Sequence, residues 1–61
     1  MELLTASELA EVLKISRTRV VLMARRGDLP AVTVDGRLRF DVAEIEQWLK
    51  ETRRGVEGVT T

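Results

Sequence analysis

The segment Lys14-Ile15-Ser16 constrains the fold most, because only these three residues separate two stretches of helical apolar spacing. Upstream, Thr5-Ala6-Ser7-Glu8 matches a capping box, which predicts that a helix starts at Ala6. Its apolar stripe comprises Ala6, Leu9, Ala10 and Leu13. Downstream, Ser16 is a suitable N-cap for a second helix over about Arg17 to Arg26. Two short helices joined this tightly cannot continue as one rod, so a helix-turn-helix is expected.

A β-hairpin is predicted directly after the second helix. Gly27 suits the left-handed residue that ends a helix, and Pro30 prevents its continuation. Asp35-Gly36 is the dipeptide that type I′ hairpin turns prefer, which predicts strands over Ala31 to Val34 and Arg37 to Phe40. The residues expected on the buried side of the hairpin are Val32, Val34, Leu38 and Phe40.

A third helix is predicted after the hairpin, because Asp41-Val42-Ala43-Glu44 resembles a capping box with Asp as the cap. Its apolar face comprises Val42, Ile45, Trp48 and Leu49. We expect Trp48 to be the centre of the core. From Gly55 onward the chain lacks periodicity, so residues 55–61 are predicted to be a flexible tail of a single domain over residues 1–54. The order of elements predicts a small α+β winged helix-turn-helix: helix, tight turn, helix, two-stranded β-hairpin wing and C-terminal helix.

Composition excludes several classes of protein. The chain has 61 residues with no Cys and no His, which removes disulfides, Cys/His zinc sites, thiol nucleophiles and imidazole acid–base chemistry. It also lacks a nucleophile–base pair and a Gly-rich phosphate loop, so we expect no enzymatic activity, no metal and no cofactor. Its longest apolar run is far shorter than the roughly 18 residues of a membrane span, and its first residues lack a signal-peptide pattern. We therefore expect a soluble protein of a reducing compartment.

The charge is distributed unevenly along a chain whose formal net charge is zero. Between residues 16 and 39, six arginines face only two aspartates, Asp28 and Asp35, which gives a local sum of +4. These arginines are Arg17, Arg19, Arg25, Arg26, Arg37 and Arg39. Arginine concentrated in this way indicates a surface that meets phosphate.

Several segments, in this order and spacing, resemble the excisionase-type DNA-binding domains related to the MerR group. They are Leu3-Leu4-Thr5-Ala6-Ser7-Glu8-Leu9-Ala10, Ile15-Ser16-Arg17-Thr18, Arg25-Arg26-Gly27-Asp28-Leu29-Pro30-Ala31, Gly36-Arg37-Leu38-Arg39-Phe40 and Glu44-Ile45-Glu46-Gln47-Trp48-Leu49. The resemblance covers about residues 3 to 50. It implies a recognition helix in the major groove of DNA and a wing on the backbone or an adjacent minor groove.

Helical geometry assigns roles within the second helix. Arg17 and Thr18, at its start, are best placed to reach base edges, and Arg19 and Arg25 are better placed to grip phosphate. Ser16 is chiefly a cap, although a capping hydroxyl can also meet a phosphate. The full set predicted to contact DNA is Ser16, Arg17, Thr18, Arg19, Leu22, Arg25, Arg26, Arg37 and Arg39.

Two features leave alternatives open. Many members of the family that this chain resembles carry an aromatic residue and then a basic or polar one where this chain has Val21-Leu22. The apolar pair could contact thymine methyls or bind protein, or a rotation of the helix could bury Val21 in the core. We expect partial burial of Val21 and an exposed Leu22. Arg37 and Arg39 project from one side of their strand as a basic wing would, but they could instead be charges that protect an edge strand.

The function expected from the resemblance is that of an excisionase, or recombination directionality factor, of a phage or mobile element in the bacterial cytoplasm. Its partners would be duplex DNA, further copies side by side, and a site-specific integrase; no membrane or small-molecule ligand is expected. The alternatives are a small transcription regulator, such as a phage repressor or antitoxin-like autoregulator, and a protein-interaction adaptor. The acidic third helix is read as a solvated face, with a surface for a basic partner as the alternative.

Overall fold

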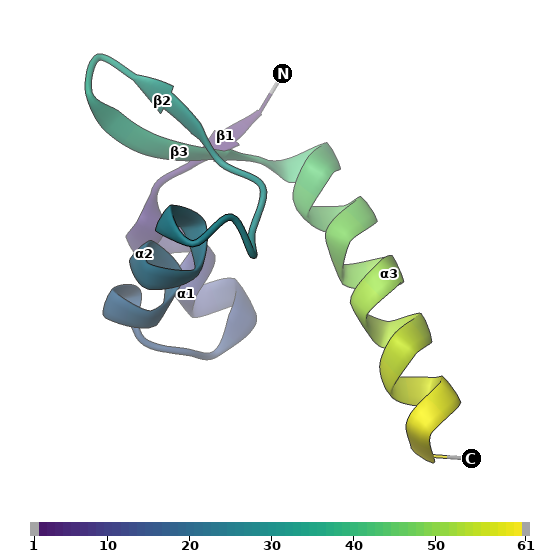
Figure 1. Cartoon of the computed structure of the whole chain (residues 1–61). Coiled ribbons are helices and arrows are strands. Elements are labelled where there is room, and N and C mark those ends of the chain that lie inside the picture. The colour runs from purple at the N-terminus through teal and green to yellow at the C-terminus, as the bar shows by residue number, and fades with distance from the viewer. Residues whose placement is uncertain (1, 61) are drawn as a thin grey trace.

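The two strands of the hairpin and a short N-terminal strand form one three-stranded antiparallel sheet, in which the second hairpin strand is central. The computed structural model describes the backbone of residues 2–60 and the side chains of residues 2–52. Its elements are β1 (Leu3–Leu4), α1 (Ala6–Leu13), α2 (Arg17–Arg25), β2 (Val32–Val34), β3 (Arg37–Asp41) and α3 (Val42–Thr60). The sheet lies on one side of α1 and α2, and α3 leaves from the end of β3 (Figure 1). This arrangement confirms the small α+β winged helix-turn-helix.

Strand β1 is the one element of the sheet that the sequence did not predict. Leu3 pairs with Asp41 and Leu4 pairs with Phe40, and the Val42 amide donates to the Glu2 carbonyl at 3.0 Å. A strand of two residues is too short to show an alternating pattern. Its pairing holds the start of α1 beside the base of the wing.

The helix starts follow the predicted capping. The Glu8 amide donates to Thr5 Oγ1 at 3.1 Å, and the Thr5 amide donates to Glu8 Oε1 at 2.9 Å, which completes the capping box of α1. Ser16 Oγ accepts a hydrogen bond of 3.1 Å from the Arg19 amide and caps α2. The tight turn and both starts are therefore confirmed.

Both helices of the helix-turn-helix end on a residue in the left-handed conformation. Gly27, with φ of 82°, follows α2; its amide donates to the Ala24 carbonyl and the Asp28 amide to the Met23 carbonyl, which is a Schellman motif. At the end of α1 the same role falls to Lys14, with φ of 61°. Lys14 carries a Cβ, so this conformation is strained there and unstrained at Gly27.

Phe40, from β3, is the centre of the core. Phe40, Leu9 and Val20 are the largest fully buried side chains, one each from β3, α1 and α2. Trp48 is only partly buried and packs against this cluster, so its predicted place at the centre is wrong. The indole lies at the margin because α3 diverges from α1 and α2 after leaving the sheet (Figure 1).

The hairpin turn forms as predicted, but the valines of β2 do not face the core. Asp35 and Gly36 both have positive φ, as a type I′ turn requires. This two-residue turn places Val34 opposite Arg37 and Val32 opposite Arg39. Directly paired residues of antiparallel strands share a face, so the valines lie with the arginines and not with Leu38 and Phe40. Val34 is accordingly 48% exposed.

Helix α3 differs from expectation at both ends. Asp41 Oδ1 accepts from the Ala43 amide at 2.9 Å, instead of from the Glu44 amide that a capping box would use. At the other end the helix continues past Gly55 to Thr60, where a tail is predicted from the sequence. The flexibility of that segment stays a prediction, and its side chains lie outside the described residues. Within the part of the chain that the structure describes, no helix has the length and apolarity to cross a membrane.

Candidate nucleic-acid interface

Four arginines from two separate elements line one groove of about 550 Å³. Arg17 and Arg25 come from α2, and Arg37 and Arg39 come from the wing. The groove, called the basic groove below, is lined by Thr5, Ala6, Ser7, Arg17, Val21, Arg25, Gly36, Arg37, Leu38 and Arg39. No acidic side chain is among these described lining residues, although Asp35 of the hairpin turn lines a neighbouring groove together with Arg37 and Arg39.

The rotation of α2 about its axis decides which side chains reach the groove. Val20 is fully buried and fixes the core side of the helix. Arg17, Val21 and Arg25 are four residues apart and therefore share one face, which turns toward the groove. Val21 is partly buried and packs against the core cluster, as expected.

Thr18 and Leu22 lie on the exposed surface of α2 beside this face. Both are exposed, and Leu22 is 54% exposed, as expected from the sequence. Their spacing of four residues places them one turn apart on the same side of the helix. They therefore extend the basic groove outward with one hydroxyl and one apolar side chain.

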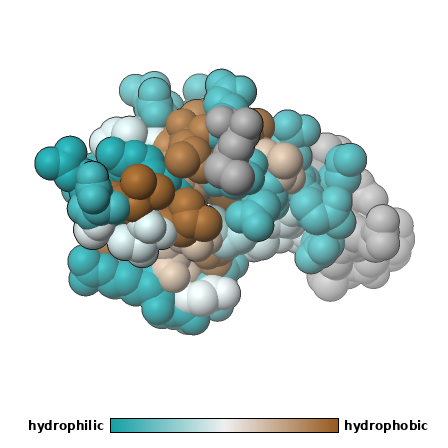
Figure 2. Space-filling model, turned by 90° about the horizontal axis from the view of Figure 1, so that it is seen from above, coloured by the Kyte–Doolittle hydropathy of each residue, from teal (hydrophilic) through white to brown (hydrophobic). Residues whose placement is uncertain are grey.

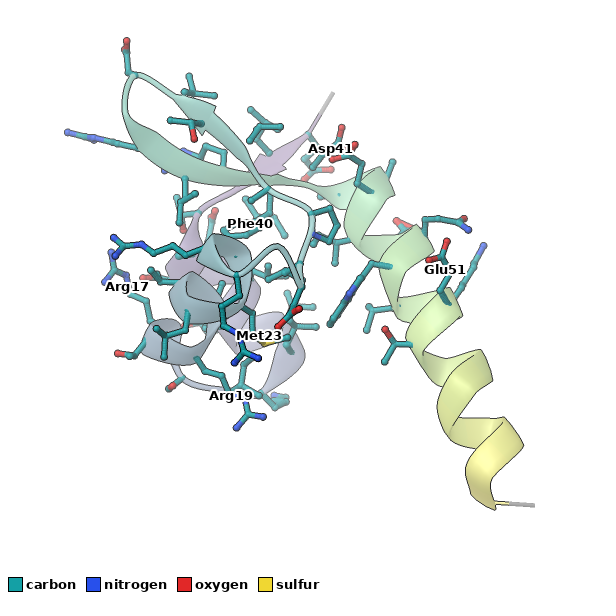
Figure 3. The ribbon with its side chains drawn as sticks, viewed as in Figure 1. Arg17, Arg19, Met23, Phe40, Asp41 and Glu51 are labelled. Atoms are coloured by element: carbon teal, nitrogen blue, oxygen red, sulfur yellow. The ribbon has the colours of Figure 1, made fainter. Side chains whose placement is uncertain are left out.

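Arg19 and Arg26 lie outside the basic groove, although both belong to the predicted contact set. Arg17 and Arg19 leave α2 in different directions (Figure 3). Arg26 Nε lies 3.3 Å from Asp28 Oδ2, and the two side chains are 74% and 51% exposed. An ion pair this exposed contributes little stability, so Arg26 remains free to change partner.

The wing arginines reach the groove over an open strand edge. β1 pairs only with Phe40 and Asp41, so the part of β3 that forms the wing has no neighbour on that side. Arg39 Nη1 donates to the Leu38 carbonyl at 2.7 Å, which folds this side chain back along its own strand. Arg39 is therefore partly buried, while Arg37 is exposed. The hydrogen bond also satisfies a carbonyl of the unpaired edge.

The sheet presents an apolar face on the side away from the helices. Leu3, Val32 and Val34 are exposed there, and strand register places them on the same face as Arg37 and Arg39. Seen from above, apolar side chains gather over the sheet with hydrophilic residues around them (Figure 2). The wing thus carries both apolar and cationic groups on its outer face.

The start of α1 also lines the groove, and the sequence did not assign it to the site. Thr5, Ala6 and Ser7 stand beside the wing because β1 holds this end of α1 against β3. Thr5 Oγ1 is occupied by the capping box, whereas Ser7 is exposed. The capping box predicted where the helix starts, but only the β1–β3 pairing shows that this start faces the groove.

The arrangement suits a polyanion larger than a small molecule. The groove is open, and its guanidinium groups, which are always charged, can donate to phosphate oxygens. A helix such as α2 fits the major groove of B-DNA, which is about 12 Å wide. Among the described residues no group of acidic side chains is placed to hold a metal ion.

One of three comparisons with known proteins found a match. Searches of the curated proteins and of the solved structures found no match. A family model described as a helix-turn-helix domain matches residues 3–53, which span α1, α2, the wing and most of α3. The chain therefore belongs to the helix-turn-helix domain family, a family of DNA-binding domains.

Proposed function

We propose that this domain binds duplex DNA sequence-specifically, with α2 in the major groove and the wing against the adjacent backbone or minor groove. The observation that carries the proposal is the basic groove, in which arginines of α2 and of the wing line one surface and no described acidic side chain is among the lining residues. Arginines on a single helix would be explained by solubility alone. Here two separate elements, α2 and the wing, place arginines on one surface, which supports the binding of one anionic ligand by both.

Each side chain of α2 takes a role from its position. Arg17 and Thr18 lie in the first turn and read base edges, Arg17 by a bidentate pair to guanine. Arg25 lies in the last turn and contacts phosphate. Leu22 is the exposed apolar group of this surface and contacts thymine methyls.

The remaining groups act on the DNA backbone. Arg37 and Arg39 extend from the wing, and Arg39 also keeps its bond to the Leu38 carbonyl. Arg19 and Arg26 lie outside the groove and reach phosphates that flank the recognised bases. Ser16 caps α2 at the end of the helix where a phosphate is favoured.

We propose further that the protein is an excisionase, or recombination directionality factor. Copies bind repeated sites side by side, bend the DNA and direct a site-specific integrase toward excision. Bending a short site costs on the order of 1–6 kcal/mol, which phosphate contacts must offset. A single domain with few cationic contacts binds weakly, so neighbouring copies raise the effective concentration. This proposal draws on the resemblance between residues 3 to 50 and excisionase-type domains.

Fluorescence anisotropy tests the proposal on labelled duplexes tiled across the gene's own locus and any adjacent attachment site. If four arginines each neutralise one phosphate, affinity falls about 100-fold between 50 and 200 mM salt. Cooperative, salt-sensitive binding to a tile with direct repeats is the expected result. Salt-sensitive binding to a lone promoter site would instead assign a transcription regulator. Absence of binding to every tile would exclude the DNA-binding function and favour a protein-interaction adaptor.

An excision assay separates the finer proposal from the coarser one. With purified integrase and a supercoiled substrate, addition of the protein should convert integrated DNA to excised circles. The Arg17→Ala variant is the matched control, since it keeps the fold but loses the proposed base contact. DNA binding without any stimulation of excision would leave a DNA-binding regulator and refute the excisionase.

A further inference from the structure

A second groove, of about 390 Å³, lies between α3 and the loop that follows α2. Its walls include Asp28 and Pro30 from the loop and Glu44, Gln47, Trp48 and Glu51 from α3. We call it the tryptophan groove. Glu51 and Arg17, which belong to different grooves, lie on opposite sides of the molecule (Figure 3).

The wall on α3 is one face of a regular helix. Glu44, Trp48 and Glu51 follow each other at spacings of four and three residues, which stack them along one side. Ile45 is buried and holds the adjacent side of α3 against the core. Glu44 and Glu51 therefore flank Trp48 along the helix, and both of their side chains are exposed.

A hydrogen bond holds the two walls of the tryptophan groove together. Trp48 Nε1 donates to the Asp28 carbonyl at 2.9 Å, across twenty residues of sequence. One side of the ring packs against the core cluster, yet the residue is only partly buried. The ring is thus fixed in orientation and still reaches the groove.

The charge of this groove is opposite to that of the basic groove. None of its described lining residues is basic. Asp28 is paired with Arg26, and Glu51 Oε1 accepts from Gln47 Nε2 at 3.2 Å. Arg26 therefore partly offsets the charge of Asp28, and Gln47 contacts the carboxylate of Glu51. Carboxylates repel DNA phosphate, so the groove does not serve the nucleic acid.

We propose that the tryptophan groove binds a lysine- or arginine-bearing segment of another protein. The cation lies on the face of the Trp48 ring, where cation–π attraction is strongest for tryptophan, and pairs with Glu44 and Glu51. Because the groove is on the far side from Arg17, the segment binds while the basic groove holds DNA. Only the statement that DNA occupies the basic groove at the same time rests on the proposed function.

Intrinsic fluorescence tests the proposal directly, since Trp48 is the only tryptophan and the chain has no tyrosine. The probe is a capped octapeptide that contains arginine, and its control is the same peptide with citrulline at every arginine. Saturable change with the arginine peptide and at least fivefold weaker binding of the citrulline peptide are expected. Equal responses to both peptides, or no response, would overturn the proposal.

Charge-neutral variants locate the binding. The double variant Glu44→Gln, Glu51→Gln should raise the dissociation constant of the arginine peptide at least fivefold. Glu46→Gln, on the same helix but outside the groove, should change it less than twofold. Equal losses of peptide affinity in the two variants would mean that only the overall charge of the protein matters, and the proposed site would be wrong.

Two further readouts keep this inference apart from the DNA-binding proposal. Anisotropy with duplex DNA should be unchanged in the double variant, whatever the peptide does. In sedimentation of the protein alone, the measured mass should not rise with protein concentration. If the mass does rise, and the double variant abolishes the rise, a second copy of this chain occupies the groove and the proposed partner is wrong.

Discussion

The basic groove and the tryptophan groove lie on opposite sides of one small domain and differ in charge, walls and rigidity. The basic groove is lined by four arginines and no described acid, whereas the tryptophan groove is lined by three carboxylates and no described base. Thus a chain with a formal net charge of zero carries two separated grooves of opposite sign. Net charge alone would have hidden both.

The two grooves also differ in how their walls are fixed. A side-chain hydrogen bond from Trp48 to the Asp28 carbonyl joins the walls of the tryptophan groove. In the basic groove, Arg39 bonds only to the adjacent residue of its own strand, and the wing projects beyond its pairing with β1. The wing can therefore adjust to a ligand, whereas the tryptophan groove is preorganised.

Truncation at the centre of the core should abolish both grooves together. Phe40 is fully buried between α1, α2 and α3, so Phe40→Ala should cost about 3–5 kcal/mol, most of the stability of a domain this small. Thermal unfolding followed by circular dichroism measures the loss. Val34→Ala, on the exposed face of the hairpin, should change stability by less than about 0.5 kcal/mol. A Phe40→Ala variant as stable as the unmodified protein would place the centre of the core elsewhere.

The basic groove alone should respond to the loss of Arg17. Arg17→Ala should weaken binding to the preferred duplex by about 1–3 kcal/mol and relax the preference at one base pair. Arg19 is two residues away but outside the groove, so Arg19→Ala should weaken DNA binding less, and by the same amount on every sequence. Anisotropy on a set of single-base variants of the duplex separates the two patterns. Equal losses for both arginines would mean that the groove does not distinguish bases.

Local sequence signals predicted the helix starts and the hairpin turn. Thr5 with Glu8, Ser16, and Asp35-Gly36 act through hydrogen bonds and backbone conformations within a few residues, so their effects can be read without the fold. The resemblance to excisionase-type domains predicted the same fold.

Four residues of the basic groove were also among those predicted to contact DNA. Helical spacing singled out Arg17 and Arg25 on α2, and strand alternation singled out Arg37 and Arg39 on the wing.

Long-range geometry was harder to predict. The register of the hairpin turned Val32 and Val34 outward, which follows from a two-residue turn but contradicts the preference of valine for the core. Trp48 was expected at the centre because of its size, yet the direction in which α3 leaves the sheet moved it to the margin. The start of α1 lines the groove only because β1 pairs with β3, and β1 is too short to show a sequence pattern that would predict this pairing.

The tryptophan groove should loosen when its joining hydrogen bond is removed. Trp48→Phe keeps an aromatic ring but loses the donor to the Asp28 carbonyl, which should cost about 1 kcal/mol of unfolding free energy. Chemical denaturation measures this, and DNA anisotropy should stay within twofold. Glu51→Gln is the control, since it alters the same groove without touching that bond. Reduced DNA affinity in Trp48→Phe would show that the two grooves are coupled.

The smallest expected effect is a gain in stability that leaves both grooves intact. Lys14 holds the left-handed position after α1 that Gly27 holds after α2, so Lys14→Gly should remove strain and stabilise the domain by about 0.5–1 kcal/mol. Lys14→Ala removes the same charge but keeps the Cβ, and it should bring no such gain. Both are compared by thermal unfolding at one salt concentration. A gain in both variants would assign the effect to charge, because only relief of backbone strain separates glycine from alanine at this position.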